Sequence, residues 1–246
     1  MPQPRGFRFF DLPAELRADI LEQLVLVPQD VPVHARAETS TESPPAALLD
    51  LFLACTQMYQ EASAIFYARN RFLVNLGSRR MFSDITAEGQ LFSPEGLDAR
   101  RRVRALRLRL RRLSGDFEKV IAPIVSDMIL CGSLRSLEIG ILTQSSGLKA
   151  NTSCRSSYGR GLEADSLVTT SPFQTLLRLL ADPDLEEAGL WVAQIHWSVW
   201  CPFHETYDGN HSCLASLRRE GIEQVSVDWE KIVRELGDVN IIARKR

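Results

Sequence analysis

The chain has 246 residues, of which 45% are hydrophobic and 24% are charged, and this composition is typical of a soluble globular protein. Its net charge is −2, so the overall charge gives no reason to expect binding to nucleic acid or acidic membranes. Five irregularly spaced cysteines argue against a disulfide framework and favour a reducing compartment. The first residues lack a signal-peptide core, and no apolar run approaches the ~18 residues that span a bilayer, so we expect an intracellular protein, cytoplasmic or nuclear.

An amphipathic helix is predicted to begin near Leu12. Asp11 is the expected N-terminal cap, and Pro13 suits the first turn, where a missing N–H is not needed. The apolar residues behind it recur at helical spacing and predict one apolar face. That face consists of Leu16, Ile20, Leu21, Leu24 and Val25.

Residues 28–45 are rich in Pro, Ser, Thr and Glu and predict a mobile, disordered loop. The apolar residues 46–55 then indicate a buried helix, and Thr56 is the expected cap of a third helix. In that third helix, Met58, Ala62, Ile65 and Phe66 share a face. Residues 72–76 (Phe-Leu-Val-Asn-Leu) predict the first strand.

Three short motifs occur in this N-terminal part of the chain. They are Leu-Pro-Ala-Glu-Leu-Arg at residues 12–17, Cys-Thr-Gln-Met-Tyr-Gln-Glu-Ala at residues 55–62, and Phe-Tyr-Ala-Arg-Asn-Arg-Phe at residues 66–72. In this order they resemble the fungal F-box-like family, in which an LPxELR helix is followed by a CxQxYxEA helix and a segment that enters the first strand. The resemblance covers about the first 76 residues, and the loop at 28–45 is a departure from the compact family unit.

The resemblance implies a function in protein–protein interaction. In F-box proteins the head binds the adaptor subunit of cullin-type ubiquitin ligases, and the C-terminal part captures a substrate. The residues that would contact the adaptor here are Leu12, Pro13, Leu16, Ile20 and Leu24. The alternative is that these residues pack the head onto the rest of the chain. Exposure distinguishes the two, because docking requires an accessible helix face.

A repeated pattern follows residue 100. Residues 103–110 (Val-Arg-Ala-Leu-Arg-Leu-Arg-Leu) have apolar residues at relative positions 1, 4, 6 and 8, and residues 134–141 and 222–229 repeat the pattern. The first two copies begin 31 residues apart. The alternating part of each copy predicts a strand with one buried face. These strands resemble those of leucine-rich repeats.

Helical stretches separate the predicted strands. Residues 117–130 and 173–180 have helical character, residues 190–199 are a further strand candidate, and residues 143–171 predict a second disordered loop. We therefore predict an α/β fold, with an F-box-like helical head at residues 1–76. A leucine-rich-repeat-like, mostly parallel sheet with helices is expected at residues 77–246.

Two clusters of polar residues could carry chemistry. Cys201, His204, His211 and Cys213 could hold zinc, but the spacing fits no familiar zinc finger, so an ordinary Gly-rich loop is favoured. An arginine run could form a basic surface for RNA phosphates or an acidic segment. Because no aromatic residue interleaves with it, a solvated sheet face paired with carboxylates is favoured. The arginines concerned are Arg102, Arg104, Arg107, Arg109 and Arg111.

No phosphate-binding loop, dinucleotide fingerprint or Gly-x-Ser-x-Gly elbow occurs, so we expect neither an enzyme nor a bound cofactor. The function that the sequence favours is protein–protein interaction, with the ligase adaptor and a substrate protein as partners. A scaffold of the same fold without a ligase connection is the first alternative, and an RNA-binding protein is the second. No membrane association is expected.

Overall fold

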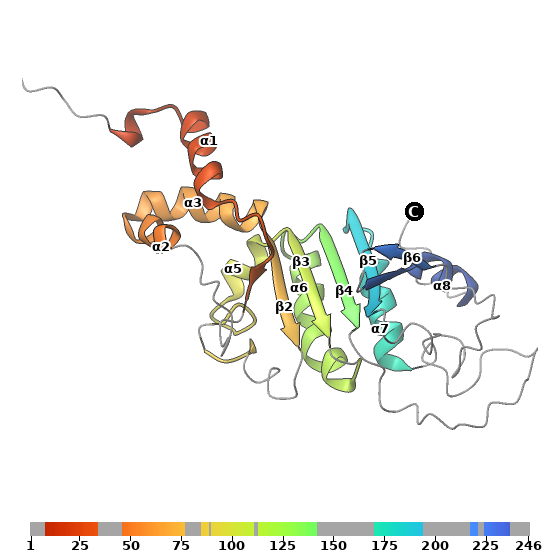
Figure 1. The fold of residues 1–246 in the computed structure, drawn as a ribbon. Helices are drawn as coiled ribbons and strands as arrows, with labels where there is room; N and C mark the ends of the chain where they lie inside the picture. The colour runs from red at the N-terminus through yellow and green to blue at the C-terminus, as the bar shows by residue number, and fades with distance from the viewer. Residues whose placement is uncertain are drawn as a thin grey trace, which may run out of the picture.

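The computed structural model describes residues 8–33, 46–76, 85–88, 90–110, 113–141, 170–193, 217–220 and 224–236. Within these residues the chain forms one mostly parallel sheet with interleaved helices, and three further helices lie at one end of the sheet (Figure 1). The predicted α/β class and the N-terminal helices are confirmed.

Seven strands of the described part of the chain make up the sheet, in the order β1-β2-β3-β4-β5-β7-β6. The neighbours from β1 to β5 run parallel, whereas β7 is antiparallel to both β5 and β6. The strands are β1 (Val31–Pro32), β2 (Arg71–Leu76), β3 (Ala105–Leu110), β4 (Ser136–Ile141), β5 (Glu187–Ala193), β6 (Leu217–Glu220) and β7 (Gln224–Val227).

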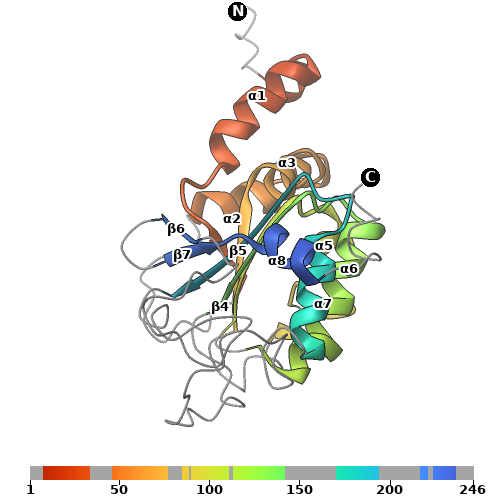
Figure 2. The same cartoon turned by 90° about the vertical axis from the view of Figure 1, so that its right-hand side faces the viewer.

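Helices cover one face of this sheet. They are α5 (Leu97–Arg102), the π-helix η2 (Phe117–Ile121) with its continuation α6 (Ala122–Leu130), α7 (Ser171–Leu180) and α8 (Trp229–Leu236). Figure 2 shows α5, α6, α7 and α8 together on one side of the strands. The sequence alternation explains the choice of face, because successive strand residues point to opposite sides and only one side is apolar.

The core lies between the strands and these helices. Each of β2, β3 and β4 contributes three buried apolar side chains, and helices η2, α6 and α7 face them with residues such as Phe117 and Phe173, both fully buried. Burying each large apolar side chain contributes about 1.5–3 kcal/mol relative to leaving it in water. The strand residues are Phe72, Val74, Leu76, Leu106, Leu108, Leu110, Leu137, Ile139 and Ile141.

The opposite face of the sheet, called here the open face, carries the alternate residues. In register, one row runs Leu73–Arg107–Glu138–Gly189 and the next runs Asn75–Arg109–Gly140–Trp191. Parallel sheets are usually buried on both faces and are then apolar throughout. Here the polar alternation in β3 and β4 specifies a sheet with helices on one face.

Three helices form the head at the β2 end of the sheet: α1 (Ala14–Val25), α2 (Ala46–Leu53) and α3 (Thr56–Arg69), preceded by the 3-10 turn η1 (Phe9–Asp11). An aromatic cluster connects the head with the sheet. Phe66 of α3 packs edge-on to Phe52 of α2 and to Phe72 of β2, with ring centroids 5.5 and 5.4 Å apart, and Tyr67 stacks on Phe72. The Phe-Tyr-x-x-Asn-x-Phe motif therefore has a direct packing role.

Several predicted details of the head are wrong. Asp11 does not cap α1: it ends η1, and Pro13 occupies the cap position without a side-chain bond. Cys55, not Thr56, caps α3, because its Sγ accepts a hydrogen bond from the Met58 amide at 3.4 Å. The predicted loop 28–45 contains β1, while its residues 34–45 lie outside the described part.

Further corrections concern the second half of the chain. Helix α5 was not predicted, since its charged sequence lacks an apolar period. Ser171, assigned to the loop 143–171, is the first residue of α7, and residues 142–169 lie outside the described part. The third copy of the pattern, 222–229, contains the antiparallel strand β7, and its Trp229 begins α8.

Candidate functional site

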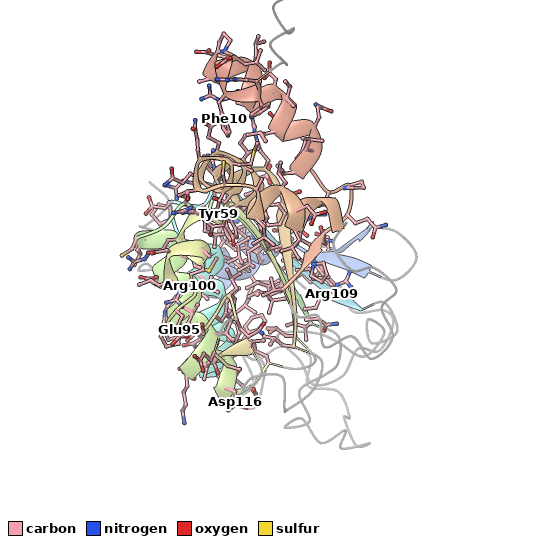
Figure 3. All side chains as sticks on the ribbon, turned by 90° about the vertical axis from the view of Figure 1, so that its left-hand side faces the viewer. Phe10, Tyr59, Glu95, Arg100, Arg109 and Asp116 are labelled. Carbon is pink, nitrogen blue, oxygen red and sulfur yellow. The ribbon has the colours of Figure 1, made fainter. Side chains whose placement is uncertain are left out.

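Exposed large apolar side chains are concentrated in the head. Of the nine such residues in the described part of the chain, all but Leu130 lie between residues 10 and 59. Figure 3 shows two of them, Phe10 and Tyr59, among the head helices, at the end of the molecule away from Asp116. Exposed apolar side chains gathered in one part of a molecule are typical of an interaction site.

Helix α1 carries the largest group. Leu16, Ile20 and Leu24, called here the α1 stripe, are 49%, 41% and 59% exposed. Their spacing of four residues places them in one row along the helix. The neighbouring row, Leu21 and Val25, is fully buried. The single apolar face predicted from the sequence is therefore divided between an internal row and a row that faces solvent.

The start of α1 is held against α3 by Arg17. Its guanidinium forms a two-pronged ion pair with Glu61, with N–O distances of 2.8 and 2.9 Å, and donates a third bond to the Leu12 carbonyl at 2.7 Å. It also lies over the ring of Phe10, 6.0 Å from the centroid. The hydrogen bonds from Arg17 hold the pKa of the Glu61 carboxyl below its usual value.

The residues at the mouth of this helix lie beside that ion pair. Leu12 is half-buried, and Pro13 is exposed at the cap position of α1. The Pro13 carbonyl accepts the first hydrogen bond of the helix from the Arg17 amide, at 3.1 Å. Leu12 and Pro13 are thus positioned at the same end of α1 as Leu16.

The end of α1 is held by Asn70, whose side chain is almost completely buried. Its amide nitrogen donates to the carbonyls of Val25 and Phe66, both at 3.0 Å, and its oxygen accepts from the Val27 amide at 2.8 Å. One side chain therefore satisfies backbone groups at the ends of α1 and α3. Together with Arg17, it fixes which side of α1 faces α3, so that the α1 stripe points away.

A second apolar group lies on α2. The sequence predicted a buried helix here, but Leu49 and Leu53 are 60% and 73% exposed, and among residues 48–53 Leu48 alone is buried. Tyr59 of α3 is also exposed and packs edge-on to Phe52, at 6.1 Å between centroids. The run 46–55 is apolar except for Asp50, and this exposed, charged residue is the one signal in the sequence that part of the helix faces solvent.

The arginines of the predicted basic surface do not form one stripe. Arg102 ends α5, with Nη1 3.5 Å from the Ser63 hydroxyl, and Arg104 is exposed between α5 and β3. Arg107 and Arg109 point to the open face of β3, while Arg111 lies outside the described part of the chain. The arginines are thus spread over a helix, a connection and a strand.

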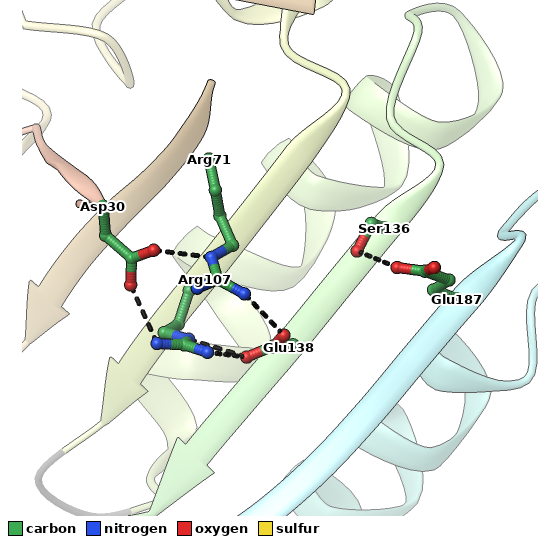
Figure 4. Close-up of polar contacts among 6 residues, drawn as sticks. All are labelled: Asp30, Arg71, Arg107, Ser136, Glu138 and Glu187. Atoms are coloured by element: carbon green, nitrogen blue, oxygen red, sulfur yellow. Dashed lines mark hydrogen bonds and ion pairs between the residues drawn. The ribbon is translucent and has the colours of Figure 1, made fainter. Parts of the chain in front are cut away.

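Arg107 belongs to a cluster of four ionised side chains on the open face (Figure 4). Asp30 accepts from Arg71 at 2.5 Å and from Arg107 at 2.8 Å, and Glu138 accepts from the same two arginines at 3.0 and 2.5 Å. Asp30 is only 12% exposed and Arg107 18%. Arg71 and Arg107 are therefore already neutralised. Of the predicted basic surface this accounts for Arg107, while Arg102 and Arg104 are exposed.

The zinc candidates Cys201, His204, His211 and Cys213 lie outside the described residues. Within the residues that the structure does describe, no group of three or more Cys, His, Asp or Glu side chains could hold a metal ion. Among those same residues, no helix combines the length and the apolar character needed to cross a bilayer.

Comparisons with known proteins give no further guide. No family model matches the chain, and neither a curated protein nor a solved structure matches it.

Proposed function

We propose that the protein is a protein–protein interaction module that docks on a partner protein through the α1 stripe. The observation that carries this proposal is the exposure of Leu16, Ile20 and Leu24 on a helix whose adjacent apolar row is buried. Moving an aliphatic side chain from water to a packed interface is favourable by about 1.5–3 kcal/mol when burial is complete. A rigid helix with an apolar row fits the common mode in which a helix lies in a partner's groove.

The partner that the sequence favours is the adaptor subunit of a cullin-type ubiquitin ligase. The F-box-like motifs support it, because Leu12, Pro13, Leu16, Ile20 and Leu24 occupy one end and one row of α1. In this reading the leucine-rich-repeat-like sheet presents a substrate protein, and the protein acts by binding and carries out no catalysis itself.

A non-ligase scaffold is the second candidate. The exposure of Leu49 and Leu53 on α2 favours it, because these residues add apolar surface that the F-box resemblance does not assign to adaptor contact. A partner that covers α2 as well as α1 would need a different shape from an adaptor that contacts α1 alone.

A pull-down with the purified ligase adaptor subunit tests the proposal. The wild type is compared with the double variant Leu16→Asp, Ile20→Asp, in which two charges replace the middle of the α1 stripe. Ala18→Asp is the matched control: Ala18 is exposed and lies 200° around the helix from Leu16. Circular dichroism checks that all three proteins are folded.

We expect the adaptor to bind the wild type and the Ala18→Asp variant but not the double variant. If the wild type does not bind the adaptor, the ligase assignment is wrong, and cross-linking at Leu24→Cys would then identify which protein covers the α1 stripe. If the double variant is unfolded while Ala18→Asp is folded, the α1 stripe is structural and the docking proposal fails.

A further inference from the structure

A row of polar side chains runs beside the α1 stripe. Glu15, Asp19 and Gln23 are exposed and follow one another at intervals of four residues, so they form a second row along α1. Asp19 comes three residues after Leu16, and Gln23 comes three residues after Ile20, which makes them neighbours on the helix surface. The two charged members, Glu15 and Asp19, are called here the acidic row.

The acidic row lies on one side of the α1 stripe only. With about 100° between successive residues, Glu15 and Asp19 lie about 100° and 60° to one side of Leu16. Arg17 lies about 100° to the other side, where it pairs with Glu61 of α3. Figures 1 and 2 show α1 projecting beyond α3, away from the strands. The α1 stripe is therefore bordered by α3 on one side and by carboxylates on the other.

The cations of the head do not neutralise these carboxylates. Arg17 and Arg69 form ion pairs with other carboxylates, at 2.8 and 3.3 Å. The remaining cation of the described head, Arg8, precedes η1 and is exposed. Among the ion pairs of the described residues, none includes Glu15 or Asp19. A partner on the α1 stripe thus meets an unpaired negative edge.

Helix stability alone does not account for Asp19. Glu15 is in the first turn of α1, where a negative charge is favourable. Asp19 lies in the helix interior, where aspartate is one of the less favourable residues. It also follows Glu15 by four residues, and like charges at this spacing repel each other. Asp19 is therefore unfavourable within the chain itself, and a cation on a partner would make it favourable.

We propose that the protein partner has an apolar groove for the α1 stripe, with lysine or arginine side chains along the edge that meets Glu15 and Asp19. This partner chemistry rests on the docking by the α1 stripe proposed above. Opposite charges at the edge of an interface speed the encounter and fix the register of the apolar contact.

A second copy of the chain does not fit this description. In a two-fold pair of antiparallel α1 helices, the same side of each helix faces its copy across the interface. The acidic row of one copy would then lie against the acidic row of the other, which is repulsive. The occupant of the α1 stripe is therefore a different protein with a basic edge.

A phage-displayed library of three-helix miniproteins, randomised over the face of two adjacent helices, tests the proposal, since the furrow between two helices holds a third. The library is selected on the full-length wild type and depleted on the Leu16→Asp, Ile20→Asp variant, so that the retained binders depend on the α1 stripe. We expect lysine and arginine to be enriched over the unselected library at positions beside apolar ones. Binding should weaken at 0.5 M salt, where exposed charges are screened.

Two single charge reversals establish where the basic edge lies. Asp19→Lys and Asp50→Lys change the net charge equally, and both residues are exposed aspartates on head helices. Asp19→Lys should weaken the selected binders about tenfold, whereas Asp50→Lys should leave their Kd within about twofold of the wild-type value. Helix α1 should tolerate Asp19→Lys, because the new cation lies four residues after Glu15. Circular dichroism checks the fold of both variants.

The outcomes separate this proposal from docking itself. If the selection yields no binder that depends on the α1 stripe, both fail. If binders depend on the stripe but are not enriched in lysine and arginine, or bind Asp19→Lys as tightly as the wild type, the basic edge is wrong and docking stands. An equal loss in Asp50→Lys also overturns the basic edge, because net charge would then explain the effect.

Discussion

Helices α1 and α7 are both rich in leucine but use it differently. In α7, Phe173, Leu176, Leu177 and Leu180 have the spacing of a single helical face, and all four are fully buried. In α1 the apolar residues form two rows, of which only Leu21 and Val25 are buried. The core of the sheet covers α7, whereas α1 packs on one helix, α3, through Arg17 and Asn70.

The difference follows from the width of the apolar arc. With 100° between successive residues, the apolar positions of α1 from Leu16 to Val25 span about 180°. A stripe of about 100° is enough to face one neighbouring element. An apolar arc wider than its packing partner leaves a row exposed, and that row is available to another protein.

Truncating one leucine to alanine in each helix is expected to give the largest difference between α1 and α7. Leu177→Ala in α7 removes a fully buried side chain and should lower the free energy of unfolding by about 2–5 kcal/mol. Leu24→Ala in α1, at 59% exposure, should change it by no more than about 0.5 kcal/mol. Urea unfolding followed by circular dichroism measures both. A loss of similar size in the two variants would show that α1 is packed on both rows.

Two positions of the open face can be compared in the same way, because each of them is a glycine with a different neighbour. Gly140→Ala places a methyl group into the ring of Trp191 and should cost about 1–3 kcal/mol of stability. Gly189→Ala meets only the side chain of Glu138 and should be neutral or slightly stabilising, because glycine in a strand loses more backbone entropy. Thermal unfolding of both variants measures the difference. Equal stabilities would contradict the packing of Trp191 over Gly140.

The sequence predicts much of the sheet and little of its contacts. The alternation in residues 105–110 and 136–141 predicted β3, β4 and their buried face, because one apolar face imposes a register. The 31-residue offset also aligns Arg107 with Glu138, so the ion pair between them could have been predicted from the repeat. The ion pair of Asp30 with Arg71 could not have been predicted, because the two residues are 41 positions apart and nothing in the sequence around Asp30 indicates this partner.

The sequence identified the residues of the candidate site but did not predict whether their side chains face solvent. Periodicity identified Leu16, Ile20 and Leu24 as apolar helix positions and could not tell whether they are covered, since that depends on where α3 lies. Asn70 is the residue that sequence reasoning missed within a motif it had recognised. A polar residue inside Phe-Tyr-x-x-Asn-x-Phe, where a helix meets a strand, indicates a buried side chain that satisfies backbone groups.

Asn70 offers a way to release α1 from the rest of the head. Asn70→Ala removes three hydrogen bonds and leaves the Val25 carbonyl and the Val27 amide without their partner. We expect a loss of about 1–3 kcal/mol, concentrated in α1. Hydrogen exchange should accelerate in residues 14–27 while β3 and β4 remain protected. Asn75→Ala, at an exposed position of β2, is the control and should leave exchange unchanged. Uniform acceleration through the sheet would show that head and sheet unfold as one unit.

Acid is expected to give the smallest effect, and it compares the head with the helices that cover the sheet, because each contains a carboxylate held by an arginine. Arg101 donates to both oxygens of Asp127, at 2.8 and 3.2 Å, and these bonds, with the attraction of Arg101 and Arg100, lower the pKa of Asp127 below its usual value near 3.8. Arg17 lowers the pKa of Glu61 in the head in the same way.

A carboxyl with a depressed folded-state pKa contributes stability above its unfolded pKa, and this contribution is lost as the pH falls through the lower, folded value. Asp127→Asn should therefore weaken the protein at pH 7 and reduce the further loss of melting temperature between pH 5 and pH 2. Glu61→Gln should instead reduce the acid-induced acceleration of hydrogen exchange in α1 and leave the exchange of α6 unchanged. If both variants alter the exchange of α1 and α6 alike, the head has no stability of its own. The α1 stripe would then be presented to a partner only by the fully folded chain.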